Sequence, residues 1–431
     1  MRPPSTPSGE NQILIIGGGI GGLTLALCLH GHGIPSLVLE AVPEIRPLGV
    51  GVNILPHGAA EMARLGLEAA LLRHCVQTDE ANFFNRHGQL VHREPLGRAA
   101  GYANPQMSIH RADLHAVLLA AARERLGEGR VLLGRRVTAV EQDAAGVTLR
   151  FAPDATGAAP EPLRGAVAIG ADGVHSVLRR QLYPEEGDPK YTGYNMWRGV
   201  APWRPILTGA SMTRVGWLAS GKMVIYPIRN DVDGQGRQLI NWVFEVESET
   251  YRSRRDWNLP GRIEDFMPWI AGWRFGWLDV PAMVRASTAV LEYPMVDQDP
   301  LPRWTFGRVT LLGDAAHPMV PRGSNGAGQS IVDARTLADL IARTPADPAA
   351  ALAPYEAQRL PATTEVVLTN RRNPPDVILR EVYERTGDRP FRRIGDVISR
   401  EEALAITGAY KRVAGYDLET LKARASAAAA G

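Results

Sequence analysis

The chain has 431 residues, a formal net charge of +2, and a composition of 45% hydrophobic and 22% charged residues. This length suffices for two domains or for one large domain with insertions, and the composition is ordinary for a globular protein. The basic residues are scattered along the chain, which argues against nucleic acid as a partner.

Neither a membrane span nor a disulfide or metal framework is expected. The sequence contains no run of eighteen apolar residues, and the Pro/Ser-rich residues 1–9 lack the apolar core of a signal peptide. Only Cys28 and Cys75 occur, and no histidines stand at metal-ligand spacing with carboxylates. We therefore expect a cytoplasmic protein without a bound metal, either a monomer or a homodimer.

The first forty residues predict a dinucleotide-binding turn. An apolar run at 13–16 leads into a glycine-rich turn and an apolar helix, the opening of a parallel doubly wound α/β sheet. Gly17 permits the tight turn, Gly19 lets the backbone approach a pyrophosphate, and Gly22 lets the helix pack against the strand. Glu40 ends the next strand, where an acid would bind ribose hydroxyls. The turn alone does not distinguish FAD from NAD.

The rest of the chain predicts a second, sheet-rich domain inserted into the first. Residues 131–133 and 137–140 are expected to resume the nucleotide sheet. Between about 190 and 290 tryptophans concentrate, and short strand-like runs replace the alternation of strand and helix. We expect a nucleotide-binding domain in three parts (11–75, 106–187 and 291–370), a mixed or antiparallel substrate domain in two parts (76–105 and 188–290), and C-terminal helices with a tail (371–431).

Two later segments identify the nucleotide. An Asp-Gly segment contains Asp172, and a Gly-Asp segment contains Asp314. Together with the first turn they resemble the class A flavoprotein aromatic hydroxylases, relatives of p-hydroxybenzoate hydroxylase, over about residues 11–370. The resemblance implies that the nucleotide domain is a Rossmann-like FAD-binding domain. Within that family, the likeness to the phenazine-modifying members rests on residues 44–53, 108–111, 196–200 and 293–297.

The resemblance also implies a set of cofactor contacts. Asp314 would hold the ribityl chain, while the Asp-Gly segment would brace the pyrophosphate region and help to receive NAD(P)H. An arginine at the head of a helix would make two charge-assisted bonds to phosphate oxygens, although a surface cap is the alternative. Gly328 departs from the family, because many relatives carry an Asn there. The implied contacts beyond the first turn are Arg46, Arg111, Asp172, Asp314, Gly326 and Ala327.

The activity that the resemblance implies is that of an FAD-dependent monooxygenase. It would use NADH or NADPH and O2 to hydroxylate an aromatic or heteroaromatic substrate through a flavin C4a-hydroperoxide, in a pocket that excludes water. Arg198 could pair with a substrate carboxylate, whereas core packing is the alternative for each tryptophan. The expected substrate pocket comprises Trp197, Arg198, Tyr226, Trp242 and Pro321.

Two other functions are compatible with parts of the pattern. A flavin oxidase, reductase or halogenase would use the same scaffold without hydroxylating a substrate, although the Trp-x-Trp-x-Ile signature of the halogenases is missing. A flavin-free binding protein of the Rab-escort type would keep a similar fold. The complete Gly-Asp segment argues against it, because the work of that segment is to hold FAD.

Overall fold

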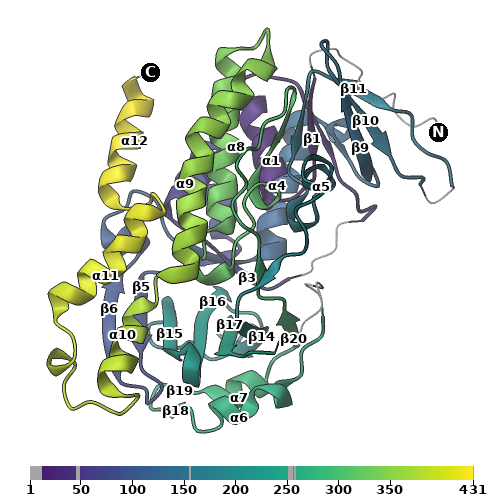
Figure 1. Ribbon diagram of the computed structural model, residues 1–431. Helices are drawn as coiled ribbons and strands as arrows, with labels where there is room; N and C mark the ends of the chain where they lie inside the picture. The colour runs from purple at the N-terminus through teal and green to yellow at the C-terminus, as the bar shows by residue number, and fades with distance from the viewer. Residues whose placement is uncertain (1–11, 45–48, 155–156, 251–255, 257–258, 431) are drawn as a thin grey trace.

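The computed structural model describes residues 12–44, 49–154, 157–250, 256 and 259–430. The predicted α/β fold class is confirmed, with a nucleotide-binding domain above an inserted sheet and helices at the C-terminal end (Figure 1). None of the helices within these ranges is long and apolar enough to cross a membrane.

A five-stranded parallel sheet forms the centre of the nucleotide-binding domain. Its strand order is β22-β12-β1-β2-β8, and every neighbouring pair runs parallel. Both faces are covered, which explains the continuous apolar runs of its strands. The strands are β1 (Ile13–Ile16), β2 (Ser36–Leu39), β8 (Val131–Leu132), β12 (Val167–Gly170) and β22 (Val309–Leu311).

Four long helices pack around this sheet. Helix α1 contacts both α4 and α8, and α8 in turn contacts α9 (Figure 1). The small hydrophobic residues of α1 are almost all buried, because the helix lies between the sheet and its neighbours. The helices are α1 (Ile20–Gly31), α4 (Arg111–Leu126), α8 (Gly326–Arg343) and α9 (Leu352–Arg372).

One expected strand belongs to another sheet. Residues 137–140 were expected to resume the nucleotide sheet, but β9 (Val137–Gln142) lies in a separate antiparallel sheet of order β11-β10-β9. The reason is local, since β9 and β10 (Val147–Phe151) form a hairpin that is completed by β11 (Leu163–Gly165). Within this hairpin the backbone of β9 forms its hydrogen bonds with β10, so β9 needs no partner in the parallel sheet.

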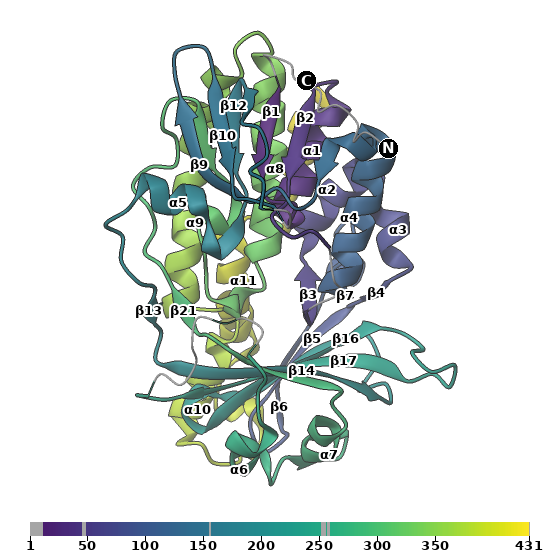
Figure 2. The ribbon, with the colours of Figure 1, turned by 90° about the vertical axis from the view of Figure 1, so that its right-hand side faces the viewer.

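The inserted domain is built on a seven-stranded mixed sheet of order β20-β14-β17-β16-β15-β5-β6. Only the β15–β5 pair is parallel. One face lies toward the nucleotide-binding domain, and helices α6 and α7 cover the other (Figure 2). The elements are β5 (Glu80–Phe84), β6 (Leu90–Pro95), β14 (Tyr194–Trp203), β15 (Ser211–Trp217), β16 (Gly221–Arg229), β17 (Gln238–Glu247), β20 (Ala289–Tyr293), α6 (Met267–Ile270) and α7 (Val280–Arg285).

Shorter elements connect these layers. A three-stranded antiparallel sheet, β3-β7-β4, joins the two domains, and helices α10 and α11 pack beside the seven-stranded sheet. The remaining elements are α2 (Pro56–Arg64), α3 (Glu68–Leu72), α5 (Val177–Leu182), α10 (Val377–Thr386), α11 (Arg400–Val413), α12 (Leu418–Ala430), β3 (Gly51–Ile54), β4 (Cys75–Gln77), β7 (Met107–His110), β13 (Lys190–Tyr191), β18 (Arg274–Phe275), β19 (Leu278–Asp279) and β21 (Val296–Asp297).

Candidate active site

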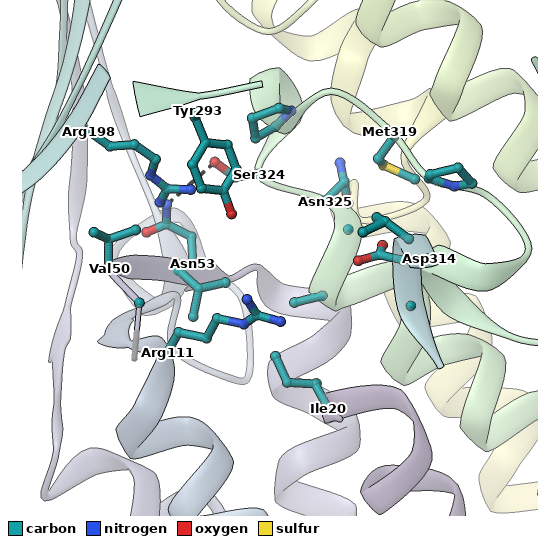
Figure 3. Close-up of a pocket in the computed structure, with 18 of the residues that line it drawn as sticks. Ile20, Val50, Asn53, Arg111, Arg198, Tyr293, Asp314, Met319, Ser324 and Asn325 are labelled. Carbon is teal, nitrogen blue, oxygen red and sulfur yellow. Dashed lines mark hydrogen bonds between the residues drawn. The ribbon is translucent and has the colours of Figure 1, made fainter. Parts of the chain in front are cut away.

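A cavity of about 580 Å³ lies between the nucleotide-binding domain and the seven-stranded sheet (Figure 3). Its lining combines the glycine-rich turn, the Asp-Gly segment and the Gly-Asp segment with one face of the sheet. Figure 3 shows Ile20 and Asp314 on one side, and Arg198 and Tyr293 on the other. The fold therefore joins the three nucleotide-binding motifs and the inserted domain at one site.

The three glycines of the first turn meet different requirements. Gly17 has a φ of 108°, and a Cβ there would lie 2.4 Å from the carbonyl oxygen of Ala171. A Cβ on Gly22 would lie 2.0 Å from the carbonyl oxygen of Gly17, so α1 could not approach its strand. Gly19 differs, because a Cβ there would meet nothing within 4 Å. This open cradle at the start of α1 fits a pyrophosphate, which the free N–H groups and the helix dipole attract.

Glu40 lies beside the first turn. Its Oε2 accepts a hydrogen bond from the backbone N–H of Gly18 at 2.8 Å, and its Oε1 accepts one from Val42 at 2.9 Å. Both oxygens retain further lone pairs, because a carboxylate can accept about four hydrogen bonds. The carboxylate thus fixes the turn, and its contact with a ribose stays a prediction.

Arg111 opens helix α4 and lines the cavity (Figure 3). The preceding His110 caps the helix, with Nδ1 accepting a hydrogen bond from the backbone N–H of Ala112 at 3.2 Å. Burial lowers the pKa of His110, which favours the neutral ring that this bond requires. A Cβ on Gly49 would lie 3.5 Å from Cβ of Arg111, so the glycine loop passes close to the arginine. Arg46 falls outside the described residues.

The Asp-Gly segment is held against the Gly-Asp segment. Asp172 accepts a hydrogen bond at Oδ2 from the backbone N–H of Val177 at 2.7 Å. Its Oδ1 is buried at the cavity wall and has no hydrogen-bond partner in the described part of the chain, and burial raises the pKa of this carboxyl. Arg179 donates from Nη1 to the carbonyl oxygens of Ala315 and Ala316, both at 3.0 Å. The orphaned oxygen suits a donor group on a bound ligand.

A buried ionic network fixes the Gly-Asp segment. Asp333 accepts hydrogen bonds from the backbone N–H of Gly313 at 3.2 Å and from Nε of Arg359 at 2.7 Å, and it pairs with His317 at 2.6 Å. Burial alone would raise the pKa of Asp333, but the charges of His317 and Arg359 outweigh it and lower the pKa. The ionised carboxylate therefore anchors the segment that presents Asp314 to the cavity.

The N-terminus of α8 is the second helix end at the cavity. Gly326 and Ala327 line the cavity, and the side chain of Asn325 does not cap the helix. Asn325 instead donates to the hydroxyl of Tyr410 at 2.9 Å, which donates to Asn370 at 2.6 Å. The first N–H groups of α8 are therefore left for a ligand, with the positive end of the helix dipole behind them.

Three supporting side chains gave no sequence signal. Arg359 reaches the network from α9, Tyr410 comes from α11, and His57 comes from α2. His57 explains the departure at Gly328, because a Cβ there would lie 2.4 Å from His57 Nε2. The sequence gives only an indirect indication of Arg359. An acid at position 333, among the apolar residues of its helix, needs a buried cation as a partner.

Three of the expected pocket residues line the cavity, two of them, Arg198 and Tyr226, on the seven-stranded sheet. Arg198 donates from Nη2 to the carbonyl oxygen of Gly51 at 2.8 Å, and its guanidinium lies 4.9 Å from the centre of the Tyr293 ring (Figure 3). Tyr226 donates to the same carbonyl at 3.2 Å, and burial raises the pKa of its phenol. Pro321 lines the cavity from the nucleotide-binding domain.

The two tryptophans expected in the pocket lie in the core instead. Successive side chains of a strand point to opposite faces, so Trp197 points away from the cavity that the adjacent Arg198 lines. Trp197 and Trp242 pack on the Phe266 ring, with centroids 5.3 and 5.4 Å apart, on the side covered by α6 and α7. The composition indicates an aromatic-rich domain, but the alternation of side chains along the strand decides whether a ring faces the cavity or the core.

Within the described part of the chain, no group of three or more His, Cys, Asp and Glu side chains could hold a metal ion. The polar groups of the cavity include backbone N–H groups, carboxylates and guanidinium groups. These groups suit an organic anion with hydroxyl groups, such as a dinucleotide.

Comparison with known proteins relates this site to flavoproteins. Residues 10–233 and 283–370 match the family described as FAD binding domain. The chain is 42% identical over 369 residues to the phenazine 1,6-dicarboxylic acid hydroxylase of Lysobacter antibioticus, covering 85% of this chain and 90% of the relative. It is 32% identical over 367 residues to 6-hydroxynicotinate 3-monooxygenase of Bordetella bronchiseptica, covering 83% and 90%.

A solved structure gives the same fold. The crystal structure of HpxO from Klebsiella pneumoniae, complexed with FAD and uric acid, superposes with a TM-score of 0.70. It is 26% identical in sequence, and the match covers 95% of this chain and 94% of that one. The family match includes the three nucleotide-binding motifs of the cavity, whereas Val243, Glu245 and Asp256 of its lining lie outside the matched residues.

Proposed function

The chain belongs to the FAD binding domain family of flavoprotein aromatic hydroxylases, and from this membership we propose that it hydroxylates a planar heteroaromatic carboxylate. The protein is an FAD-dependent aromatic monooxygenase that uses NAD(P)H and O2. FAD, when bound, supplies the electron transfer and the activation of oxygen. The residues of the chain bind and orient the reactants and keep water away from them.

The residues proposed to hold FAD are those whose placement suits its parts. The turn at Gly17, Gly19 and Gly22 would receive the pyrophosphate, Asp314 the ribityl chain, and the start of α8 the flavin ring. A helix N-terminus favours negative charge, so this end of α8 would stabilise the reduced flavin anion. Glu40, Arg111 and Asp172 are proposed as further contacts.

The proposed substrate class depends on one observation, which is that the cavity wall facing the nucleotide-binding motifs is basic. Arg198 lines the cavity and is partly buried, and its Nε has no hydrogen-bond partner within the described ranges. A guanidinium in such a place favours a carboxylate on the substrate. The names of two relatives, a phenazine dicarboxylic acid hydroxylase and a hydroxynicotinate monooxygenase, support a heteroaromatic acid.

A substrate screen tests the proposal. Purified yellow protein is incubated with NADH or NADPH, O2 and a panel containing phenazine-1-carboxylate, 6-hydroxynicotinate and 3-hydroxybenzoate. We expect one heteroaromatic acid to accelerate NAD(P)H oxidation and to gain one atom of ¹⁸O from ¹⁸O2. Stimulated oxidation that yields hydrogen peroxide with every acid, and no labelled product, would instead identify an oxidase.

Replacement of Asp314 tests the cofactor site. Asp314→Ala removes a carboxylate from the cavity wall, and a hydrogen bond to a charged group is worth about 1.5–3 kcal/mol. We expect the dissociation constant of FAD, measured by fluorescence quenching, to rise about 10- to 100-fold. Asp347→Ala, at an exposed acid beside Arg308, is the matched control and should leave FAD affinity unchanged. Equal FAD affinity in the Asp314 variant would refute its assignment.

We also propose a cytoplasmic location and a monomeric or homodimeric state. Both cysteines, Cys28 and Cys75, are free and buried, and burial raises the pKa of each thiol to about 12. Unpaired thiols are compatible with a reducing compartment. Light scattering of the purified protein distinguishes the two oligomeric states.

A further inference from the structure

A buried arginine outside the expected pocket lines the same cavity. Arg322 lies in the turn Pro321–Gly323, directly before helix α8, and is only 8% exposed. Among the residues that the structure describes, its Nε and Nη2 atoms have no hydrogen-bond partner. An arginine side chain stays protonated at any working pH. A buried guanidinium with two unsatisfied donors is costly, so it calls for an anionic partner.

The guanidinium group of Arg322 is held by stacking on its flat side, while the N–H groups at its edge remain available for a ligand. The guanidinium carbon lies 3.7 Å from the centre of the Tyr194 ring. Stacking on an aromatic face uses the flat side of the guanidinium, while the N–H groups point outward in its plane. That arrangement is suited to bidentate pairing with a carboxylate, whose two oxygens match two parallel N–H groups.

Two buried carboxylates, Glu245 and Asp376, already have a cation. Lys222 is buried between Glu245 and Asp376 and forms ion pairs with both. Asp376 feels the charge of Arg322, but among the described residues the two form no ion pair. Once this triad is set aside, the sheet end of the cavity is lined by three arginines and one further carboxylate: Arg198, Arg214, Arg322 and Asp256.

Of these arginines, Arg322 has the most buried donor atoms without a partner in the described part of the chain, two against one in Arg198 and none in Arg214. Arg198 donates to the carbonyl oxygen of Gly51 and stacks on Tyr293. Arg322 stacks on Tyr194, which lies in the same strand, β14, as Arg198. Ser324 of the same loop receives a hydrogen bond from Asn53 at 3.4 Å, and Figure 3 shows both near Arg198. The loop therefore brings Arg322 to the substrate end, away from the glycine cradle proposed for the pyrophosphate.

We propose that Arg322 pairs with a carboxylate of the aromatic substrate and thereby sets the preference of the enzyme for anionic substrates. This inference rests on the proposed function and identifies the residue that recognises the acid. Pairing would satisfy the free donors of Arg322 and would place the acid beside the loop that opens α8. A neutral analogue would leave the same donors unsatisfied and would therefore bind more weakly.

The test compares a charged and a neutral probe in the holoenzyme. Phenazine-1-carboxylate and phenazine-1-carboxamide have nearly the same shape, and their binding is measured from the perturbation of the flavin absorption spectrum. We expect the wild type to prefer the carboxylate about 10- to 100-fold, as a charged hydrogen-bonded pair predicts. In Arg322→Met the preference should fall to about 2-fold or less, with the affinity for the carboxamide unchanged.

Three further variants separate charge from structure. Arg322→Lys keeps the charge without the paired donors, so it should retain part of the preference. Arg303→Met removes another arginine that stacks on an aromatic ring, at 4.5 Å from the centre of Phe306, and should retain all of it. Arg198→Met should reduce the preference less than Arg322→Met does.

Each other outcome overturns the inference. A preference that survives in Arg322→Met removes Arg322 as the anchor, while the proposed substrate class stands. Equal loss of both probes in that variant indicates a structural role. Weaker FAD binding with an unchanged preference indicates that Arg322 pairs with the flavin. If the wild type binds neither probe nor the other acids of the panel, the proposed substrate class fails together with the role of Arg322.

Discussion

Replacing Gly19 with valine should give a folded protein that purifies without FAD. The backbone of Gly19 is extended, with φ of −76°, so a side chain is tolerated there without strain. A Cβ would meet no protein atom within 4 Å, which means that the valine would occupy the space proposed for the pyrophosphate. We expect wild-type far-UV circular dichroism, no visible flavin absorption, and no NAD(P)H oxidation.

Two other glycines make this prediction specific. Gly22→Val should fail to fold, because its Cβ would lie 2.0 Å from the carbonyl oxygen of Gly17. Gly129→Val is the matched control, since a Cβ there also meets nothing within 4 Å but the residue does not line the cavity. It should fold and retain FAD. A yellow Gly19→Val protein with normal FAD affinity would disprove the proposed position of the pyrophosphate.

Replacing Lys222 with methionine should destabilise the protein by about 3–5 kcal/mol at pH 7, the usual cost of breaking a buried ion pair. Lys222 is 1% exposed and is paired with Glu245 and Asp376, whose charges the variant would leave uncompensated. The measurement is the free energy of unfolding from urea denaturation of the apo-protein. Lys190→Met breaks the exposed pair with Asp299 and should cost about 0–1 kcal/mol.

The pH dependence of this effect follows from Asp376. Burial alone would raise the pKa of Asp376, but the charges of Lys222, Arg214 and Arg322 outweigh it and lower the pKa. A lowered pKa contributes stability above the unfolded value of about 3.9, and this stability is lost as the pH falls. Without Lys222 burial dominates and the pKa rises, so the deficit of the variant should shrink between pH 7 and pH 5.

A compensated variant separates charge from packing. Lys222→Met combined with Glu245→Gln and Asp376→Asn removes all three charges of the triad. Because this variant leaves none of the three charges buried without its partners, it should recover most of the stability that the single variant loses. A deficit of the single variant that is the same at pH 5 and pH 7, and that persists in the triple variant, would indicate lost packing rather than uncompensated charge.

Much of the nucleotide-binding half could be predicted because its signals are local. The turn at Gly17, Gly19 and Gly22 depends on φ angles and close approaches within a few residues, which spacing alone encodes. The strand-like runs at 80–84 and 90–95 are likewise local signals, and strands β5 and β6 form there and pair within the seven-stranded sheet. Such features depend on neighbours in the sequence, so the sequence alone determines them.

The substrate end of the cavity was decided by the tertiary structure. Trp197 and Arg198 are adjacent in sequence, yet the register of β14 between β17 and β20 sends one to the core and the other to the cavity. The free donors of Arg322 and the pairing of Lys222 with Asp376 arise from elements that meet only in the folded chain. Burial and electrostatic compensation are properties of packed neighbours, and no spacing along the chain specifies those neighbours.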